Sequence, residues 1–237
     1  MKDFEKWQIV SFISRFGAQI IGIFQVFLVA LILTPFEYGL YSISNGLSKT
    51  FGSYQNLGLQ SSSTREIAAA KDLKEAFKIF LVSASFRYLV SIPLAVLLFI
   101  FSDYFANVQY LEPRIEMALK VYAGIILLQA IQGIFNTVLS GLKKFKIIFS
   151  YQVAIALISF LVTVPAVYFL EFEGTYISYL IVTLISVLVL GYFALKSFEG
   201  NFTKINRHEY FVILKEIFSL SVAVYIVKVI LSNWENF

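Results

Sequence analysis

Long apolar segments separated by short polar turns dominate the sequence. A helix that crosses about 30 Å of hydrocarbon needs roughly 20 mostly apolar residues. Windows of about that length can be drawn at seven places: residues 7–33, 36–57, 77–101, 117–139, 147–170, 175–195 and 217–232. The pattern predicts an all-α integral membrane protein. The second window is the weakest, because serine, asparagine, glutamine and lysine interrupt it.

Composition agrees with this class. Of the 237 residues, 59% are hydrophobic and 14% charged, whereas an ordinary soluble domain has roughly 45–50% and 25%. So few charged residues cannot cover the surface of a soluble protein of this size. Cysteine is absent, which excludes disulfides and thiol chemistry. His208 is the single histidine, so few side chains could ligate a metal. We therefore predict neither a metal site nor a cofactor.

Basic residues alternate between the turns. Cytoplasmic loops of membrane proteins collect lysine and arginine. Every second turn is basic, and the turns between carry only Arg114. The basic set is Lys2, Lys6, Arg65, Lys71, Lys74, Lys78, Lys143, Lys144, Lys146, Lys196, Lys204, Arg207 and Lys215. This pattern predicts a cytoplasmic N-terminus. Nucleic acid is not a predicted partner, because the charge is spread over turns and not clustered on a soluble face.

The stretch 196–216 is the one lengthy segment that reads as lying outside the membrane. We expect residues 1–195 to form a six-helix transmembrane lobe and residues 196–216 to form a cytoplasmic connector. Residues 217–237 then read as the first helix of a truncated second lobe. A second lobe, as a separate chain or a second copy, is accordingly an expected partner.

Five basic residues fall inside the predicted spans: Arg15, Lys49, Arg87, Lys120 and Lys228. A charge near the bilayer centre costs about 2.5–3.5 kcal/mol on insertion scales, so it usually faces protein or water. Lys120 is close to a span end, and we expect it to extend to the interface. No acidic residue occupies the middle of the membrane to pair with the others. Such a set suits an anionic ligand, for example a phosphate or diphosphate.

Small or polar residues also recur at helical spacing on several spans. Residues three and four apart share a helix face, although small and hydroxyl residues also serve helix packing in membranes. The candidate binding residues are Arg15, Gln25, Asn45, Lys49, Arg87, Gln132, Asn136 and Lys228.

Motifs of enzymes are missing. The sequence shows no Walker loop, no metal-ligand pair and no carboxylate pair within the spans. A membrane-bound polymerase would need a large outside loop that carries catalytic residues, and the predicted outside turns are short. We therefore expect a protein that is not an enzyme.

Three short motifs carry a resemblance to a known family. They are LTPFEYGLY at 33–41, NLGL at 56–59 followed by SSSTREIA at 61–68, and GLKKFK at 141–146. They resemble, in order, the outer turn after helix one, the end of helix two and the turn between helices four and five of bacterial polysaccharide flippases, which translocate O-antigen and exopolysaccharide units. Thr34 stands where that family usually has glycine, and Phe36 where it has an acid.

The resemblance implies a fold and a function. The family has two six-helix lobes around a central cavity, joined by a connector after helix six, and it shares this fold with multidrug exporters and lipid II flippases. It implies that lipid-linked (undecaprenyl-diphosphate) oligosaccharide moves across the cytoplasmic membrane of bacteria by alternating access. By the resemblance, Arg15 and Lys49 are nearest to the basic residues that bind the diphosphate. A cation-coupled drug exporter of the same fold and an inactive truncated lobe remain alternatives.

Overall fold

The computed structural model describes residues 2–56 and 58–234, with the side chains of 2–11, 13 and 228–234 left aside. Every regular element of that part is helical, which confirms the all-α prediction. The elements are α1 (Lys2–Ile32), α2 (Pro35–Ser53), α3 (Leu59–Ala69), α4 (Leu73–Tyr104), the π-helical turn η1 (Phe105–Gln109), α5 (Arg114–Gly141), α6 (Phe145–Lys196) and α7 (Arg207–Trp234).

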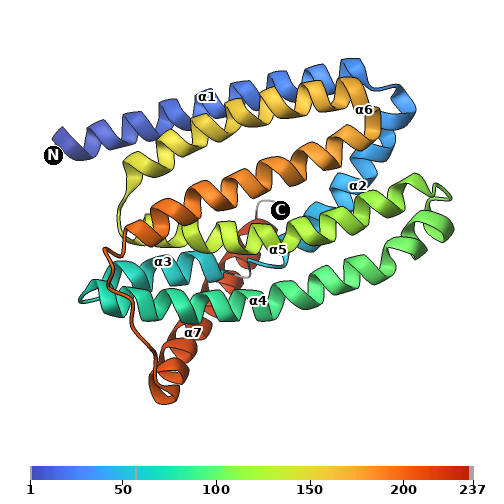
Figure 1. Ribbon diagram of the computed structural model, residues 1–237. Coiled ribbons are helices and arrows are strands. Elements are labelled where there is room, and N and C mark those ends of the chain that lie inside the picture. Colours follow the sequence, from blue (N-terminus) through green and yellow to red (C-terminus); the bar gives the residue numbers. More distant parts are fainter. Residues whose placement is uncertain (1, 57, 235–237) are drawn as a thin grey trace.

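Five of these helices are long and apolar enough to cross a membrane: α1, α4, α5, α6 and α7. The chain is therefore a multi-pass membrane protein. The helix α5 lies at the centre of the bundle and packs against α2, α3, α4 and α6 (Figure 1). Its Tyr122, Ile125 and Ile126 are almost completely buried. The helix α1 packs against α6, and its opposite face exposes large apolar side chains such as Phe16, Ile23 and Phe27.

The second predicted span is interrupted in the structure. It begins at a capping box, where the Glu37 amide donates to Thr34 Oγ1 at 3.3 Å and the Thr34 amide donates to Glu37 Oε2 at 3.1 Å. The helix ends at Ser53, and Gly58, with φ of +80°, precedes the second piece α3. Together α2 and α3, with 19 and 11 residues, run from one end of the bundle to the other (Figure 1).

The second predicted span, 36–57, therefore corresponds to α2, which ends four residues earlier, and much of the basic turn predicted after it is helical, in α3. Ser62 and Thr64 lie in this part of the chain, and hydroxyl side chains often compete with the helix backbone. Here these hydroxyls donate to carbonyl groups one turn earlier: Ser62 Oγ lies 3.2 Å from the Gly58 oxygen, and Thr64 Oγ1 lies 2.7 Å from the Gln60 oxygen. Their hydrogen-bonding needs are met within the helix.

The fifth and sixth predicted spans form one helical hairpin, α6. Its two arms, residues 145–170 and 172–196, meet at a sharp kink at Glu171, where φ is 51° and ψ is −129°. The arms lie side by side (Figure 1). Gly174 makes the kink possible, because a Cβ at this position would overlap the carbonyl oxygen of Ala166 on the first arm.

The helix α7 crosses α3 and α4 and does not run alongside the long helices (Figure 1). Ser221 Oγ and Ser62 Oγ lie 2.7 Å apart in a buried hydrogen bond, and Lys78 Nζ donates to Glu209 Oε1 at 2.8 Å. The helix already begins at Arg207, so the non-helical part of the connector predicted at 196–216 is limited to residues 197–206.

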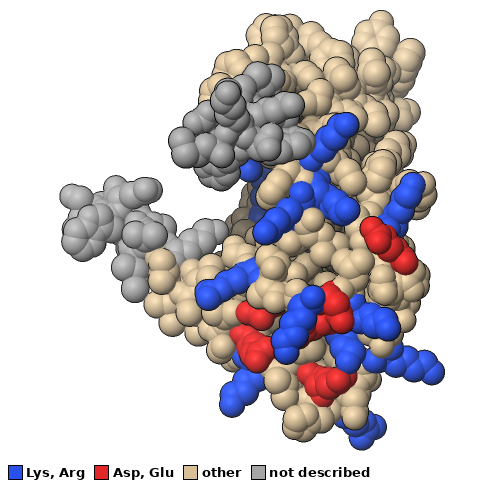
Figure 2. Space-filling view, turned by 90° about the vertical axis from the view of Figure 1, so that its left-hand side faces the viewer, with Lys and Arg blue, Asp and Glu red and all other residues tan. Residues whose placement is uncertain are grey.

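Basic turn residues gather at one end of the bundle. The α3–α4 turn, the α5–α6 turn and the end of α6 meet there, and Figure 2 shows this end covered by lysine, arginine and acidic side chains. The α1–α2 turn, the end of α4 and the α6 kink lie at the opposite end (Figure 1). We call these the basic end and the far end.

This separation predicts the topology. Because cytoplasmic loops are enriched in basic residues, single cysteines at Lys74, Lys144 and Lys204 should react only with a reagent added from the cytoplasmic side. Cysteines at Phe36, Asn107 and Glu173 should react only from the outside. The natural chain has no cysteine, so it serves as the unlabelled control. Labelling at Lys144 from the outside would contradict the assignment.

Candidate binding cavity

Two adjoining pockets lie between α1, α2, α5 and the two arms of α6. The first has a volume of about 200 Å³ and is named here the Lys49 pocket; the second, of about 440 Å³, is named the Arg15 pocket. Ser159 and Tyr179 line both pockets, so the two adjoin, and together they are called the cavity below. Other lining residues are Gln25, Tyr41, Asn45, Tyr122, Thr163, Thr175 and Ser178 in the Lys49 pocket, and Gln19, Gln129, Gln132, Tyr151, Gln152, Thr183 and Ser186 in the Arg15 pocket.

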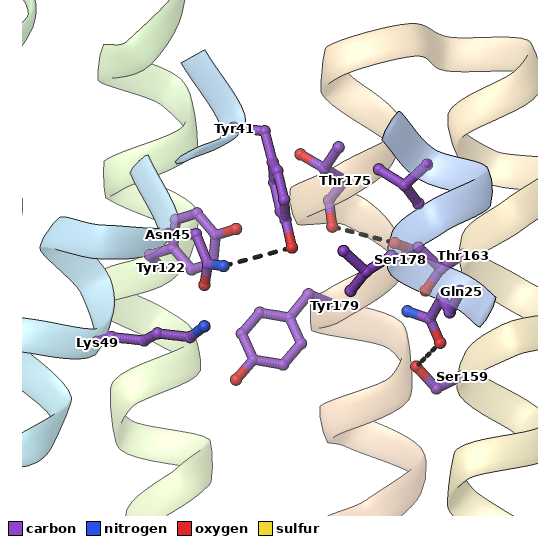
Figure 3. A pocket seen from close by; sticks show the side chains of 12 residues that line it. Gln25, Tyr41, Asn45, Lys49, Tyr122, Ser159, Thr163, Thr175, Ser178 and Tyr179 are labelled. Carbon is purple, nitrogen blue, oxygen red and sulfur yellow. Dashed lines mark hydrogen bonds between the residues drawn. The ribbon is translucent and has the colours of Figure 1, made fainter. Parts of the chain in front are cut away.

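Five of the eight predicted binding residues meet in this cavity. Arg15 and Gln132 line the Arg15 pocket, and Gln25, Asn45 and Lys49 line the Lys49 pocket. They come from α1, α2 and α5, so residues far apart in the chain converge on one space. Figure 3 shows the Lys49 side chain directed from α2 towards Tyr179.

Hydrogen bonds hold the neutral polar side chains in place. Asn45 Nδ2 donates to the Tyr41 hydroxyl at 3.3 Å, and Ser159 Oγ donates to Gln25 Oε1 at 3.0 Å (Figure 3). In the Arg15 pocket, Gln132 Nε2 donates to the Tyr151 hydroxyl at 3.0 Å. Each of these bonds joins two lining residues, so the cavity wall is preorganised and still presents amide and hydroxyl groups to a ligand.

The charge of the cavity is entirely positive. Arg15 and Lys49 line it, no aspartate or glutamate does, and neither cation takes part in an ion pair within the described residues. Lys49 lies 14 residues from the start of α2. This places it about 21 Å along the helix axis from the far end of the bundle. A cation at such depth needs water or an anion beside it. The cavity can therefore hold an anionic group, with hydrogen-bonding side chains around it.

Three predicted binding residues do not line the cavity. Arg87 is buried between α4 and α5, and its guanidinium occupies the space that a Cβ on Gly133 would need. Asn136 lies outside the lining of both pockets. The side chain of Lys228 falls outside the described residues. Arg87 has no acidic partner, and its Nε has no hydrogen-bond partner among the described residues.

The polar residues of α6 were missed by the sequence analysis. The first arm contributes Gln152, Ser159 and Thr163, and the second contributes Thr175, Tyr179 and Thr183. Their spacing of four or seven residues places each set on one helix face. This periodicity is present in the sequence, but it stands within the most apolar windows, where the average hydropathy conceals it.

Lys120 behaves differently from the cavity cations. It pairs with Glu116 one turn earlier on α5, close to the far end, and its Nζ lies 5.7 Å from the centre of the Phe99 ring. Its charge is thus compensated locally and away from the cavity. This agrees with the expected position at the interface.

Residues 6–233 of the chain match the model of a protein family whose description is "polysaccharide biosynthesis protein". No curated protein and no solved structure matches the chain.

Proposed function

Because the chain belongs to the polysaccharide biosynthesis protein family, whose role is in polysaccharide biosynthesis or export, we propose that it translocates lipid-linked oligosaccharide. The substrate would be an undecaprenyl-diphosphate-linked oligosaccharide, and the membrane would be the cytoplasmic membrane of a bacterium. The N-terminus and the basic end would face the cytoplasm. The protein would act as a transporter and not as an enzyme.

The observation that carries this proposal is the cavity with two cations and no acid. A diphosphate needs positive charge, and a glycan needs amide and hydroxyl partners. Arg15 and Lys49 supply the charge, and Gln25, Asn45 and Gln132 supply hydrogen-bonding groups at neighbouring positions. The tyrosines of the wall, such as Tyr179, offer flat apolar surfaces against which sugar rings can pack.

Alternating access would move the substrate. In transporters built from repeats, the site lies between two structural units and one unit rocks against the other. The second unit would be a further lobe, in the same polypeptide, in a separate chain or in a second copy. The exposed face of α1, with Phe16, Ile23 and Phe27, offers apolar surface for such a contact. A cation-coupled drug exporter of the same fold would instead favour acidic cavity residues, and none lines these pockets.

A flipping assay tests the proposal. The chain, together with its second lobe, is reconstituted in proteoliposomes that contain a fluorescent undecaprenyl-diphosphate oligosaccharide in the inner leaflet. We expect the fluorophore to become accessible to an external quencher faster than in protein-free vesicles. An equal rate in both preparations would overturn the proposed function.

A further inference from the structure

A second, apolar groove lies between the two arms of α6. It has a volume of about 360 Å³, and its walls include Ala154 and Ile158 from the first arm and Val189 and Phe193 from the second. Lys146, the second residue of α6, stands at the basic end of the groove. No acidic residue lines it.

The groove and the polar cavity share a wall. Tyr151 and Ile155 line both the groove and the Arg15 pocket. Tyr151 is buried, and its hydroxyl accepts a hydrogen bond from Gln132 Nε2 on the cavity side. One side chain therefore presents its polar end to the cavity and contributes apolar surface to the groove.

The length of the groove corresponds to one leaflet. From Lys146 to Ile158 the first arm rises by about 18 Å, at 1.5 Å per residue. Half of a typical hydrocarbon core is about 15 Å. A lipid whose phosphate lies at Lys146 could thus extend its chain along the groove to the middle of the membrane.

Charge complementarity favours an anionic lipid at this position. Lys146 is exposed, and Lys143 and Lys144 precede it in the α5–α6 turn. Three ammonium groups at one end of an apolar groove match a lipid with a highly charged headgroup. On the other side of Tyr151, the Arg15 pocket offers the next cationic position for that headgroup.

We propose that this groove is a loading site for the polyprenyl diphosphate carrier in the leaflet at the basic end. Lys146 contacts the diphosphate, and the polyprenyl chain lies between the arms of α6. The headgroup then passes Tyr151 into the Arg15 pocket. This inference rests on the proposed function, since the same lipid-linked substrate occupies both sites.

Photo-crosslinking in phosphatidylcholine nanodiscs tests the loading site, with a geranylgeranyl diphosphate that carries a diazirine at the end of its chain as the probe. We expect label on peptides that contain residues 147–158 and 189–193 of the natural chain. Ala154→Phe fills the groove and should reduce this labelling about tenfold, because the phenyl ring occupies the space in which the lipid chain would be buried. The matched control is Leu157→Phe, an equally large side chain at an exposed position of the same arm outside the groove.

Two further comparisons test whether Lys146 binds the headgroup and whether the groove prefers a polyprenyl diphosphate to another anionic lipid. Lys146→Gln should lower the labelling, whereas Lys71→Gln, in the α3–α4 turn and outside the groove lining, should not. Excess unlabelled geranylgeranyl diphosphate should compete with the probe, and the same excess of phosphatidylglycerol should not. Equal labelling of Ala154→Phe and Leu157→Phe, or equal competition by phosphatidylglycerol, would overturn the loading site, because the groove would then hold any membrane lipid.

Binding of inorganic diphosphate in the same nanodiscs distinguishes the two proposals. If wild type binds it and Lys49→Ala does not, while Ala154→Phe leaves the labelling unchanged, the loading site fails and the proposed function stands. If wild type binds neither inorganic diphosphate nor the probe, the proposed function fails, and the loading site fails with it.

Discussion

Replacing Lys49 with alanine should reduce transport of the lipid-linked oligosaccharide at least about tenfold. Lys49 lines the cavity without an acidic partner. A hydrogen bond to a charged group contributes about 1.5–3 kcal/mol, and about 1.4 kcal/mol corresponds to a factor of ten. Arg15→Ala should act in the same direction. The measurement is the quenching rate in proteoliposomes with equal amounts of inserted protein.

Two variants control this prediction. Lys49→Arg keeps the charge but changes its geometry, so it should retain part of the activity. Lys120→Ala removes a basic residue from a span, but that residue pairs with Glu116 outside the cavity, so transport should remain close to wild type. Normal transport by both Lys49→Ala and Arg15→Ala would contradict the assignment of the cavity cations.

Replacing Gly174 with alanine should destabilise the fold by about 3 kcal/mol, the upper range for overpacking. The added Cβ would overlap the Ala166 carbonyl oxygen, which belongs to the backbone and cannot change rotamer. The two arms of α6 would have to separate at the kink. Since both arms line the cavity, binding should fall together with stability.

Thermal unfolding in detergent, followed by loss of the monodisperse peak, measures this effect. Gly124→Ala is the matched control, because Gly124 lies within α5 and a Cβ there meets no atom within 4 Å. Its substitution should be neutral or slightly stabilising, since alanine favours the helix over glycine. Equal melting temperatures for the Gly124 and Gly174 variants would show that the kink tolerates a side chain.

Hydropathy predicted the long helices because the demand for about 20 apolar residues acts directly on the sequence. It did not predict α3, where Ser62 and Thr64 lower the average hydropathy although their hydroxyls bond within the helix. It also left open how the fifth and sixth spans are joined. That connection depends on a residue with positive φ, Glu171, and on the close approach of Gly174 to Ala166, which only the folded backbone reveals.

The cavity was predicted in part for a related reason. A charge within an apolar window stands out in a sequence, so Arg15, Lys49 and Arg87 were all candidates. Which of them faces the cavity depends on how each helix is rotated against its neighbours. Arg87 turns towards Gly133 on α5, whereas Lys49 turns towards the space next to Tyr179. The uncharged stripes of α6 complete the wall, and a search for charge passes over them.

Binding of undecaprenyl diphosphate to the Arg15→Ala, Lys49→Ala double variant tests the central claim most directly. In nanodiscs, wild type should bind undecaprenyl diphosphate and should not bind the uncharged alcohol undecaprenol. The double variant should lose the preference for the diphosphate while it keeps the wild-type melting temperature, because both side chains are exposed in the structure. A well-folded double variant that binds undecaprenyl diphosphate as tightly as wild type would contradict a cationic substrate cavity.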